Sequence, residues 1–341
     1  MASFASLLGP DDYAWFADAA RRIEEAEARF DDVDGVGALW GNSDSDSDSD
    51  GVRQGAAVAV DGGENSAAAG ADEADGADEA EAVADARRFA SLFQLSRWRR
   101  WASPGDGRDV IHYRTSCGAS GHGDVVWSAA DYVAASVLRG DDFWAAGAPP
   151  AGAAHGLAGK RVVELGAGLG LPGLAFFRRG ASVVLTDAPT PASLCCLAAN
   201  ARRALAAPRA RRGASVAVRR LAWGAPTLAL GRFDVVVACD CVYNPIAHSA
   251  LLQSILDLLS ESGVAIVAFA LHGNAKDADV LSFFDAASAV ANVFEAGAHQ
   301  MRLSESMAAQ GMVRDDADGR KRAFVRVFLL RPRPGLTNGA P

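Results

Sequence analysis

The sequence predicts an α/β fold in which a seven-stranded parallel sheet is covered by helices on both faces. Three observations predict this fold. From Ala86 onward, short β-branched or apolar runs alternate with helical segments; a glycine-rich loop joins the first run to its helix; and an acidic residue ends the second run. Strands that alternate with helices form parallel sheets, because parallel neighbours need a crossover connection.

The first 85 residues differ in composition from the rest, so we divide the chain into an N-terminal region, 1–85, and a folded domain, 86–341. Residues 1–42 contribute a charge of −6 and Ser43–Asp85 contributes −12; because the whole chain carries −9, the domain carries +9. Apolar residues at helical spacing predict a short amphipathic helix over Asp11–Phe30. The Ser-, Asp-, Gly-, Ala- and Glu-rich stretch from about Asn42 to Asp85 buries too little apolar surface to offset its ordering entropy, so we expect it to be disordered.

Each strand and helix of the domain is predicted from the local pattern of apolar and polar residues. Short runs of β-branched residues predict strands, and a continuous apolar run predicts a central strand buried on both faces. The predicted strands are Arg161–Leu165, Ser182–Asp187, Ser215–Trp223, Phe233–Asp240, Val264–Leu271, a weak strand near Val293, and Ala323–Leu330. The predicted helices are Pro172–Arg179, Ser193–Leu205, Ala247–Leu259 and Asp279–Ala289, and a polar loop at Gly311–Lys321 precedes the last strand.

The glycine loop lies between the first predicted strand and its helix. Its glycines are Gly166, Gly168 and Gly170, and glycines there permit a tight turn and a close approach of the backbone to a ligand. The following helix offers unpaired N–H groups at its N-terminus. Asp187 ends the second strand, 21 residues after Gly166. Its carboxylate can accept hydrogen bonds from both hydroxyls of a ribose, so this edge of the sheet predicts a nucleotide-like ligand.

Two cofactor classes use such a loop, the nicotinamide dinucleotides and S-adenosylmethionine. Glu164 stands two residues before Gly166, where a dinucleotide-binding strand usually remains apolar. The third glycine, Gly170, comes one residue early for the G-x-G-x-x-G pattern of the dinucleotide fold. Asp187 fits either class. The spacing therefore favours S-adenosylmethionine.

Five motifs occur in order along the chain. They are Val126–Ala130 (VWSAA), Glu164–Gly173 (ELGAGLGLPG), Leu185–Asp187 (LTD), Leu221–Gly224 (LAWG) and Asp240–Tyr243 (DCVY). Over roughly residues 121–271 the chain resembles the lysine methyltransferase group of the seven-strand S-adenosylmethionine-dependent methyltransferases (methyltransferase family 16). The resemblance implies a Rossmann-like seven-stranded methyltransferase sheet, S-adenosyl-L-methionine as cofactor, and a lysine side chain of a folded protein as substrate.

The resemblance also implies which residues bind the cofactor. In order, they are Trp127, Glu164, Gly166, Ala167, Gly168, Asp187, Trp223 and Cys239. Trp127 flanks the cofactor, the loop lines its methionine side, Asp187 holds the ribose, Trp223 lies beside the adenine, and Cys239 contributes a backbone contact. For both tryptophans the alternative is ordinary core packing. The group often has Asp before the tryptophan of the LAWG motif, whereas this chain has Ala222, which removes one polar contact near the adenine.

The catalytic residues implied by the resemblance are Asp240 and Tyr243, at the carboxyl end of the fourth strand. A carboxylate can orient the incoming amine, and an aromatic ring can contact it through a cation–π interaction. The alternative is structural: Asp240 caps the next helix and Tyr243 packs against it, although Asn244 and Pro245 can themselves start that helix. His272, which ends the fifth strand at the same edge, is not included in the expected site.

Other functions remain open at this point. They are a small-molecule, nicotinamide-type N-methyltransferase, a catalytically silent cofactor-binding scaffold, and an NAD-binding oxidoreductase, the last disfavoured by the glycine spacing. Nucleic acid is not the expected substrate, because the Asn-Pro-Pro-aromatic clamp for a flipped base is missing after the fourth strand. The arginines around Trp98 and Trp101 form either a charged contact surface or, as we prefer, the solvated face of a helix.

The remaining expectations concern the environment of the protein. Five cysteines without a C-x-x-C pair predict neither a zinc site nor a disulfide framework, so we expect no metal and a reducing compartment. No apolar run reaches the ~18 residues that span a bilayer. We therefore expect a monomer in the cytoplasm, with the nucleus as the other compartment considered, and no membrane partner.

Overall fold

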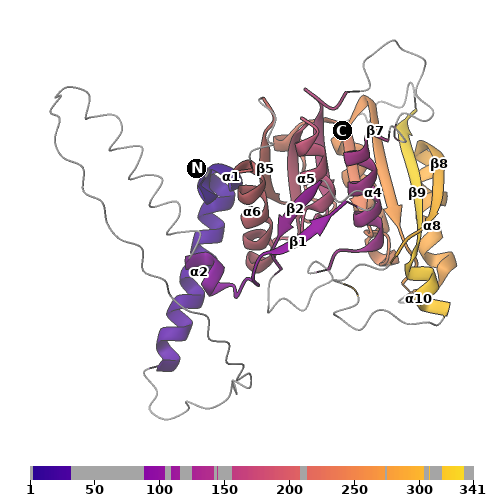
Figure 1. Cartoon of the computed structure of the whole chain (residues 1–341). Helices are drawn as coiled ribbons and strands as arrows, with labels where there is room; N and C mark the ends of the chain where they lie inside the picture. Colours follow the sequence, from indigo (N-terminus) through magenta and orange to yellow (C-terminus); the bar gives the residue numbers. More distant parts are fainter. Residues whose placement is uncertain are drawn as a thin grey trace, which may run out of the picture.

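The computed structural model describes residues 3–31, 88–103, 109–115, 125–141, 144, 156–207, 213–272, 275–302, 307 and 317–333 (Figure 1). The acidic stretch expected to be disordered, from about Asn42 to Asp85, lies outside these residues, as do residues 311–316 of the predicted Gly311–Lys321 loop. The loop prediction is wrong for the remaining residues, which lie in the helix Ala317–Arg322. In the described part of the chain, no helix is long and apolar enough to cross a membrane.

A seven-stranded sheet forms the centre of the molecule and confirms the predicted fold class. Its spatial order is β5-β4-β3-β6-β7-β9-β8. The strands are β3 (Arg161–Leu165), β4 (Ser182–Asp187), β5 (Val216–Arg220), β6 (Phe233–Cys239), β7 (Leu259–Phe269), β8 (Ala291–Gln300) and β9 (Phe324–Pro332). The chain order reverses between β3 and β6, and ligands of open α/β sheets bind at the carboxyl ends of the strands beside such a switch point.

The sheet is mixed rather than purely parallel. The five strands from β5 to β7 are parallel, but β9 runs antiparallel to both of its neighbours, β7 and β8. The expectation of an all-parallel sheet is therefore wrong at this end. An antiparallel neighbour needs no crossover over a face of the sheet, so β9 can run back beside β8 after the connecting segment that contains α10 (Ala317–Arg322), and it occupies the space between β7 and β8. β8, predicted only as a weak strand, pairs with β9 over most of its length.

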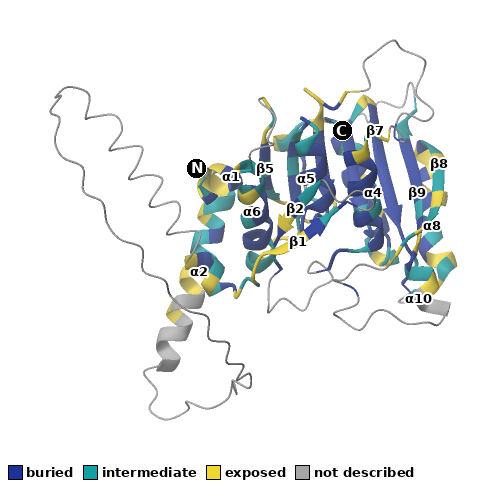
Figure 2. Cartoon of the chain, viewed as in Figure 1, coloured by how far each residue is buried: buried dark blue, intermediate teal, exposed yellow. Residues whose placement is uncertain are grey.

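Helices cover both faces of the sheet, as predicted. Side chains that alternate along each strand enter two separate cores: Val162 of β3 packs with the first group of helices and Val163 with the second. The first group is α4 (Ser128–Arg139), α5 (Leu171–Arg178) and α6 (Pro191–Leu205); the second is α7 (His248–Leu258) and α8 (Asp277–Val290). Figure 2 shows the resulting band of buried residues along the sheet.

A short hairpin lies against the first group of helices. Its strands are β1 (Arg99–Ala102) and β2 (Val110–Tyr113). Trp101 is buried, and its indole Nε1 donates a hydrogen bond to Oδ1 of Asp131 on α4, 2.8 Å away. The preferred interpretation of the basic run around Trp101 as a helix face is therefore wrong, because this run forms strand β1, in which Trp101 is buried while Arg99 and Arg100 are exposed.

Two helices at the N-terminal end pack onto the domain. They are α1 (Phe4–Leu8) and α2 (Pro10–Asp31), so the predicted amphipathic helix is confirmed with slightly wider bounds. Phe4 and Phe16 are buried, and the Phe16 ring lies edge-on to Phe89 with centroids 4.7 Å apart. These rings belong to the same apolar core as α5 and α6. The division of the chain at residue 86 stays a prediction, but its N-terminal part shares a core with the domain.

Polar contacts attach these helices to β5, which is an edge strand of the sheet. Arg219 donates to the carbonyl oxygen of Leu7 at 2.7 Å. Arg220 donates from Nε to Oδ1 of Asp12 at 2.6 Å, and its guanidinium lies over the Trp15 ring. The N-terminal helices therefore cover an edge strand that would otherwise be open to pairing with another chain.

Candidate active site

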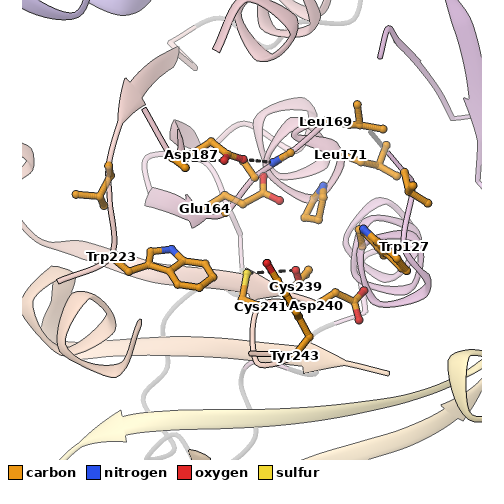
Figure 3. A pocket seen from close by; sticks show the side chains of 18 of the residues that line it. Trp127, Glu164, Leu169, Leu171, Asp187, Trp223, Cys239, Asp240, Cys241 and Tyr243 are labelled. Atoms are coloured by element: carbon orange, nitrogen blue, oxygen red, sulfur yellow. Dashed lines mark hydrogen bonds between the residues drawn. The ribbon is translucent and has the colours of Figure 1, made fainter. Parts of the chain in front are cut away.

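A cavity of about 400 Å³ opens at the carboxyl ends of β3, β4 and β6. Its size is within the range of small-molecule sites. All ten residues that the sequence assigned to the site line this cavity: Trp127, Glu164, Gly166, Ala167, Gly168, Asp187, Trp223, Cys239, Asp240 and Tyr243. Figure 3 shows Trp223 and Trp127 on opposite sides, with Glu164 and Asp187 along one edge and Tyr243 opposite them.

The glycine loop forms the wall of the cavity next to Trp223. Gly166, Gly168 and Gly170 have φ values of +60°, +51° and +76°, which side-chain-bearing residues rarely adopt. A Cβ on Gly166 would lie 3.0 Å from both the Trp223 ring and the sulfur of Cys241. Glycine is therefore required here for both backbone conformation and space.

Glu164 is almost fully buried at the end of β3, with 2% of its surface exposed. Its Oε2 accepts a hydrogen bond of 2.8 Å from the backbone N–H of Gly173, in the first turn of α5. Burial raises the pKa of Glu164 to about 8, and the nearby negative charge of Asp187 contributes in the same direction. The carboxyl group therefore connects the strand to the helix beside the cavity and binds its proton tightly.

We expect Glu164→Gln to change how stability depends on pH. Folding raises the pKa of Glu164 from 4.5 to about 8. Protonation of Glu164 therefore contributes its whole share of the folding free energy below pH 4.5, and this contribution is lost as the pH rises through about 8. Glutamine retains an acceptor for Gly173 and does not ionise. The variant should match the wild type near pH 5 and be more stable at pH 9, by about 1.4 kcal/mol for each pH unit between the unfolded and the folded pKa. Chemical denaturation at both pH values measures this, and parallel pH profiles would contradict it.

Asp187, at the end of β4, holds the glycine loop. Its Oδ2 accepts from the N–H of Gly168 at 2.6 Å, and its Oδ1 accepts from the N–H of Ala188 at 2.7 Å. Burial raises the pKa of Asp187, while these two hydrogen bonds act to lower it. Each carboxylate oxygen has a second lone pair, so the group can also accept from ligand hydroxyls.

Asp240 adopts an unusual conformation immediately after β6, with φ of +53°. Its Oδ1 accepts from the N–H of Ala270 at 2.9 Å and contacts Nε2 of His272 at 3.1 Å, and its Oδ2 accepts from the N–H of Ala129 at 3.1 Å. Asp240 thus binds the first turn of α4, a helix N-terminus distant in sequence. The expected contact with a substrate amine stays a prediction, and the next helical turn is instead capped by Asn244, whose Oδ1 accepts from the N–H of Ile246.

Two other residues lie on this side of the site, one lining the cavity and one behind Asp240. The Tyr243 ring lines the cavity, and burial raises the pKa of its hydroxyl. His272, which was not among the predicted site residues, is buried against Asp240, and its ring is edge-on to Trp127 with centroids 4.6 Å apart. The signal for His272 was its position directly after the predicted strand Val264–Leu271, but only the three-dimensional structure shows its contact with Asp240.

Comparisons with known proteins identify a family and several similar chains. A family model described as lysine methyltransferase matches residues 108–288. Protein N-lysine methyltransferase METTL21A of Danio rerio is 39% identical over 114 residues, covering 33% of this chain and 50% of that protein. Protein N-terminal and lysine N-methyltransferase EFM7 of Gibberella zeae is 31% identical over 146 residues, covering 38% and 55%. The chain thus spans about half the length of these two relatives.

Solved structures were compared in the same way. A putative SAM-dependent methyltransferase from Streptococcus mutans aligns with a TM-score of 0.47 and 12% identity, covering 74% of this chain and 65% of that one. The assignment rests instead on the family model, whose match from residue 108 to residue 288 covers more than half of the 341 residues. This protein belongs to the lysine methyltransferase family.

Proposed function

We propose that this chain transfers a methyl group from S-adenosylmethionine to the amine of a lysine side chain on a folded protein. The observation that carries the proposal is the cavity. It brings the glycine loop, the strand-end acid Asp187 and two facing tryptophans to the carboxyl edge of the sheet, with Asp240 and Tyr243 beside them. Residues from five separate motifs meet there although they are far apart in the sequence.

The residues present fit S-adenosylmethionine. Because Gly166 has no Cβ, the Trp223 ring packs directly against the glycine loop, and this ring forms a flat wall of the cavity against which an adenine can lie. Asp187 has acceptor capacity for the ribose hydroxyls. The pocket wall also includes the apolar side chains of Leu169 and Leu171, which suit the less polar parts of such a ligand.

The chemistry of this reaction asks little of the protein beyond alignment. When bound, S-adenosylmethionine supplies an activated methyl group on a sulfonium, which a neutral amine attacks in line. Lysine has a reference pKa of about 10.4, so its ammonium must lose a proton before it can attack. A partly desolvated, aromatic-lined entrance lowers that pKa. Trp127 and Tyr243 provide the aromatic walls, and Asp240 orients the amine from the end of β6.

The same proposal includes the substrate, the oligomeric state and the compartment. The substrate is a protein that presents a lysine at the cavity entrance, and the enzyme acts as a monomer in the cytoplasm. The charge of +9 on residues 86–341 is compatible with an acidic partner.

Incubation of the full chain with radiolabelled S-adenosylmethionine and total cell lysate tests the proposal. The full chain is needed because α1 and α2 share the core of the domain. We expect a discrete labelled protein, with the label recovered as methyl-lysine after hydrolysis. Asp187→Ala should abolish the label, whereas Asp257→Ala, which alters an acid on α7 bonded only to Gln253 among the described residues, should retain it.

The other outcomes separate the alternatives. Label found only in small molecules would replace the protein substrate with a small-molecule amine. Binding of S-adenosylmethionine by calorimetry without transfer to any acceptor would indicate a cofactor-binding scaffold. A folded wild type that does not bind the cofactor would contradict the proposal as a whole.

A further inference from the structure

His272 lies directly behind the substrate side of the cavity but is not among the residues that line it. It follows β7, and only 7% of its side chain is exposed. Its Nε2 lies 3.1 Å from Oδ1 of Asp240, and its ring is edge-on to Trp127 at an interplanar angle of 61°. A single buried ring therefore contacts both Asp240 and Trp127, which do line the cavity.

The hydrogen bonds of this ring indicate its role. A neutral imidazole has one donor and one acceptor nitrogen, and an ionised carboxylate can only accept. The nitrogen facing Asp240, Nε2, must therefore carry the hydrogen. Nδ1 is buried and has no hydrogen-bond partner among the described residues. Burying an unpaired polar atom is unfavourable, so the single bond to Asp240 is the polar contact that accounts for a histidine at this position.

The side chain of Asp240 extends from a backbone in the left-handed region, with φ of +53°. Its other two bonds come from the backbone N–H groups of Ala129 and Ala270. Backbone donors fix where the carboxylate lies, but His272 is its only side-chain donor among the described residues. Without it, Oδ1 would retain one bond, and the carboxylate could rotate when a cationic lysine approaches.

We infer that His272 is a positioning residue that fixes the Asp240 carboxylate for the incoming lysine amine. The inference rests on the proposed function for its catalytic consequence, but the geometric part stands independently. His272 touches neither substrate nor cofactor. It acts through Asp240, and through the Trp127 contact it keeps the same wall of the cavity in place.

Two substitutions separate positioning from simple packing. In His272→Gln the side-chain amide nitrogen occupies the place of Nε2 and can still donate to Asp240. In His272→Asn the shorter side chain places its amide nitrogen where Nδ1 was, so this nitrogen cannot reach the Asp240 carboxylate. The two variants are both neutral, polar and smaller than histidine, so they differ mainly in the bond to Asp240.

The first measurement is amide hydrogen exchange in the full chain, followed by NMR at Ala129 and Ala270. These are the two N–H groups that Asp240 accepts from. His272→Asn should reduce protection at both by on the order of tenfold, and His272→Gln should leave both within about threefold of the wild type. In the methyl-transfer assay, kcat should fall by on the order of tenfold for Asn and recover with Gln, while the Kd for S-adenosylmethionine should agree within about threefold between the two variants, because both lose the ring that contacts Trp127.

Equal exchange rates in the two variants, or unchanged protection in His272→Asn, would overturn the inference. A wild type that labels no protein would refute the proposed substrate and leave the exchange result to decide on His272. If His272→Asn does not fold, the ¹⁵N resonances of the wild-type ring decide instead. Hydrogen on Nε2 with a bare Nδ1 supports the inference, and the opposite tautomer contradicts it.

Discussion

Asp187→Ala should remove cofactor binding, raising the Kd for S-adenosylmethionine by about 100-fold or more. The substitution deletes the acceptors for the ribose hydroxyls and also releases the N–H of Gly168, which Asp187 holds at 2.6 Å. Hydrogen bonds to charged groups contribute about 1.5–3 kcal/mol each, and every 1.4 kcal/mol is a factor of ten in Kd. Isothermal titration of the full chain measures the effect.

The Asn variant at the same position refines this prediction. Asp187→Asn retains one carbonyl oxygen, so its Kd should lie between those of the wild type and Asp187→Ala. Asp257→Ala on α7 is the matched loss of an acid far from the cavity and should leave the Kd within about threefold. An Asp187→Ala protein that is folded and binds normally would show that the ligand is held elsewhere.

Phe16→Ala should lower the free energy of unfolding by about 3–5 kcal/mol, although residue 16 lies outside the domain that composition defines. The ring is fully buried and contacts Phe89 and Phe93, with centroids 4.7 Å and 5.4 Å away. Its removal leaves a cavity in the core that α2 shares with α6. Urea denaturation followed by circular dichroism measures the change.

Ala14→Lys on the exposed face of the same helix is the control. It adds a good helix former without touching the core, so the stability should change by less than about 0.5 kcal/mol. A loss below about 1 kcal/mol in Phe16→Ala would mean that α2 is attached only loosely in solution. In that case residues 86–341 would suffice for a stable domain.

The parts of the fold that were predictable have a strong local pattern. β6 is apolar apart from Asp234, and its residues alternate between the two cores, Val235 and Val237 on one face and Val236 and Ala238 on the other. The direction of β9 was not predictable, because an apolar strand has the same composition in either direction. The attachment of α1 and α2 depends on contacts across more than 200 residues, such as Arg219 with Leu7, which no local pattern contains.

In the site, too, some features are predictable from the sequence and others are not. Gly166 and Asp187 follow from spacing alone, since a strand, a tight turn and a helix must place them at one edge. The contacts of Asp240 do not, because they depend on its positive φ and on donors at Ala129, Ala270 and His272, from two other elements. Sequence can identify a residue as a member of a site while the partners that set its orientation remain hidden.

The position of β9 has a consequence for synthesis of the chain. β7 and β8 precede β9 in sequence, yet in the finished sheet they do not pair with each other and both pair with β9. A nascent polypeptide that has emerged only as far as β8 therefore exposes two unsatisfied strand edges, one of them on the apolar β7. Such edges are templates for intermolecular association. Chaperone dependence during translation should accordingly be greatest in the interval between the appearance of β8 and that of β9.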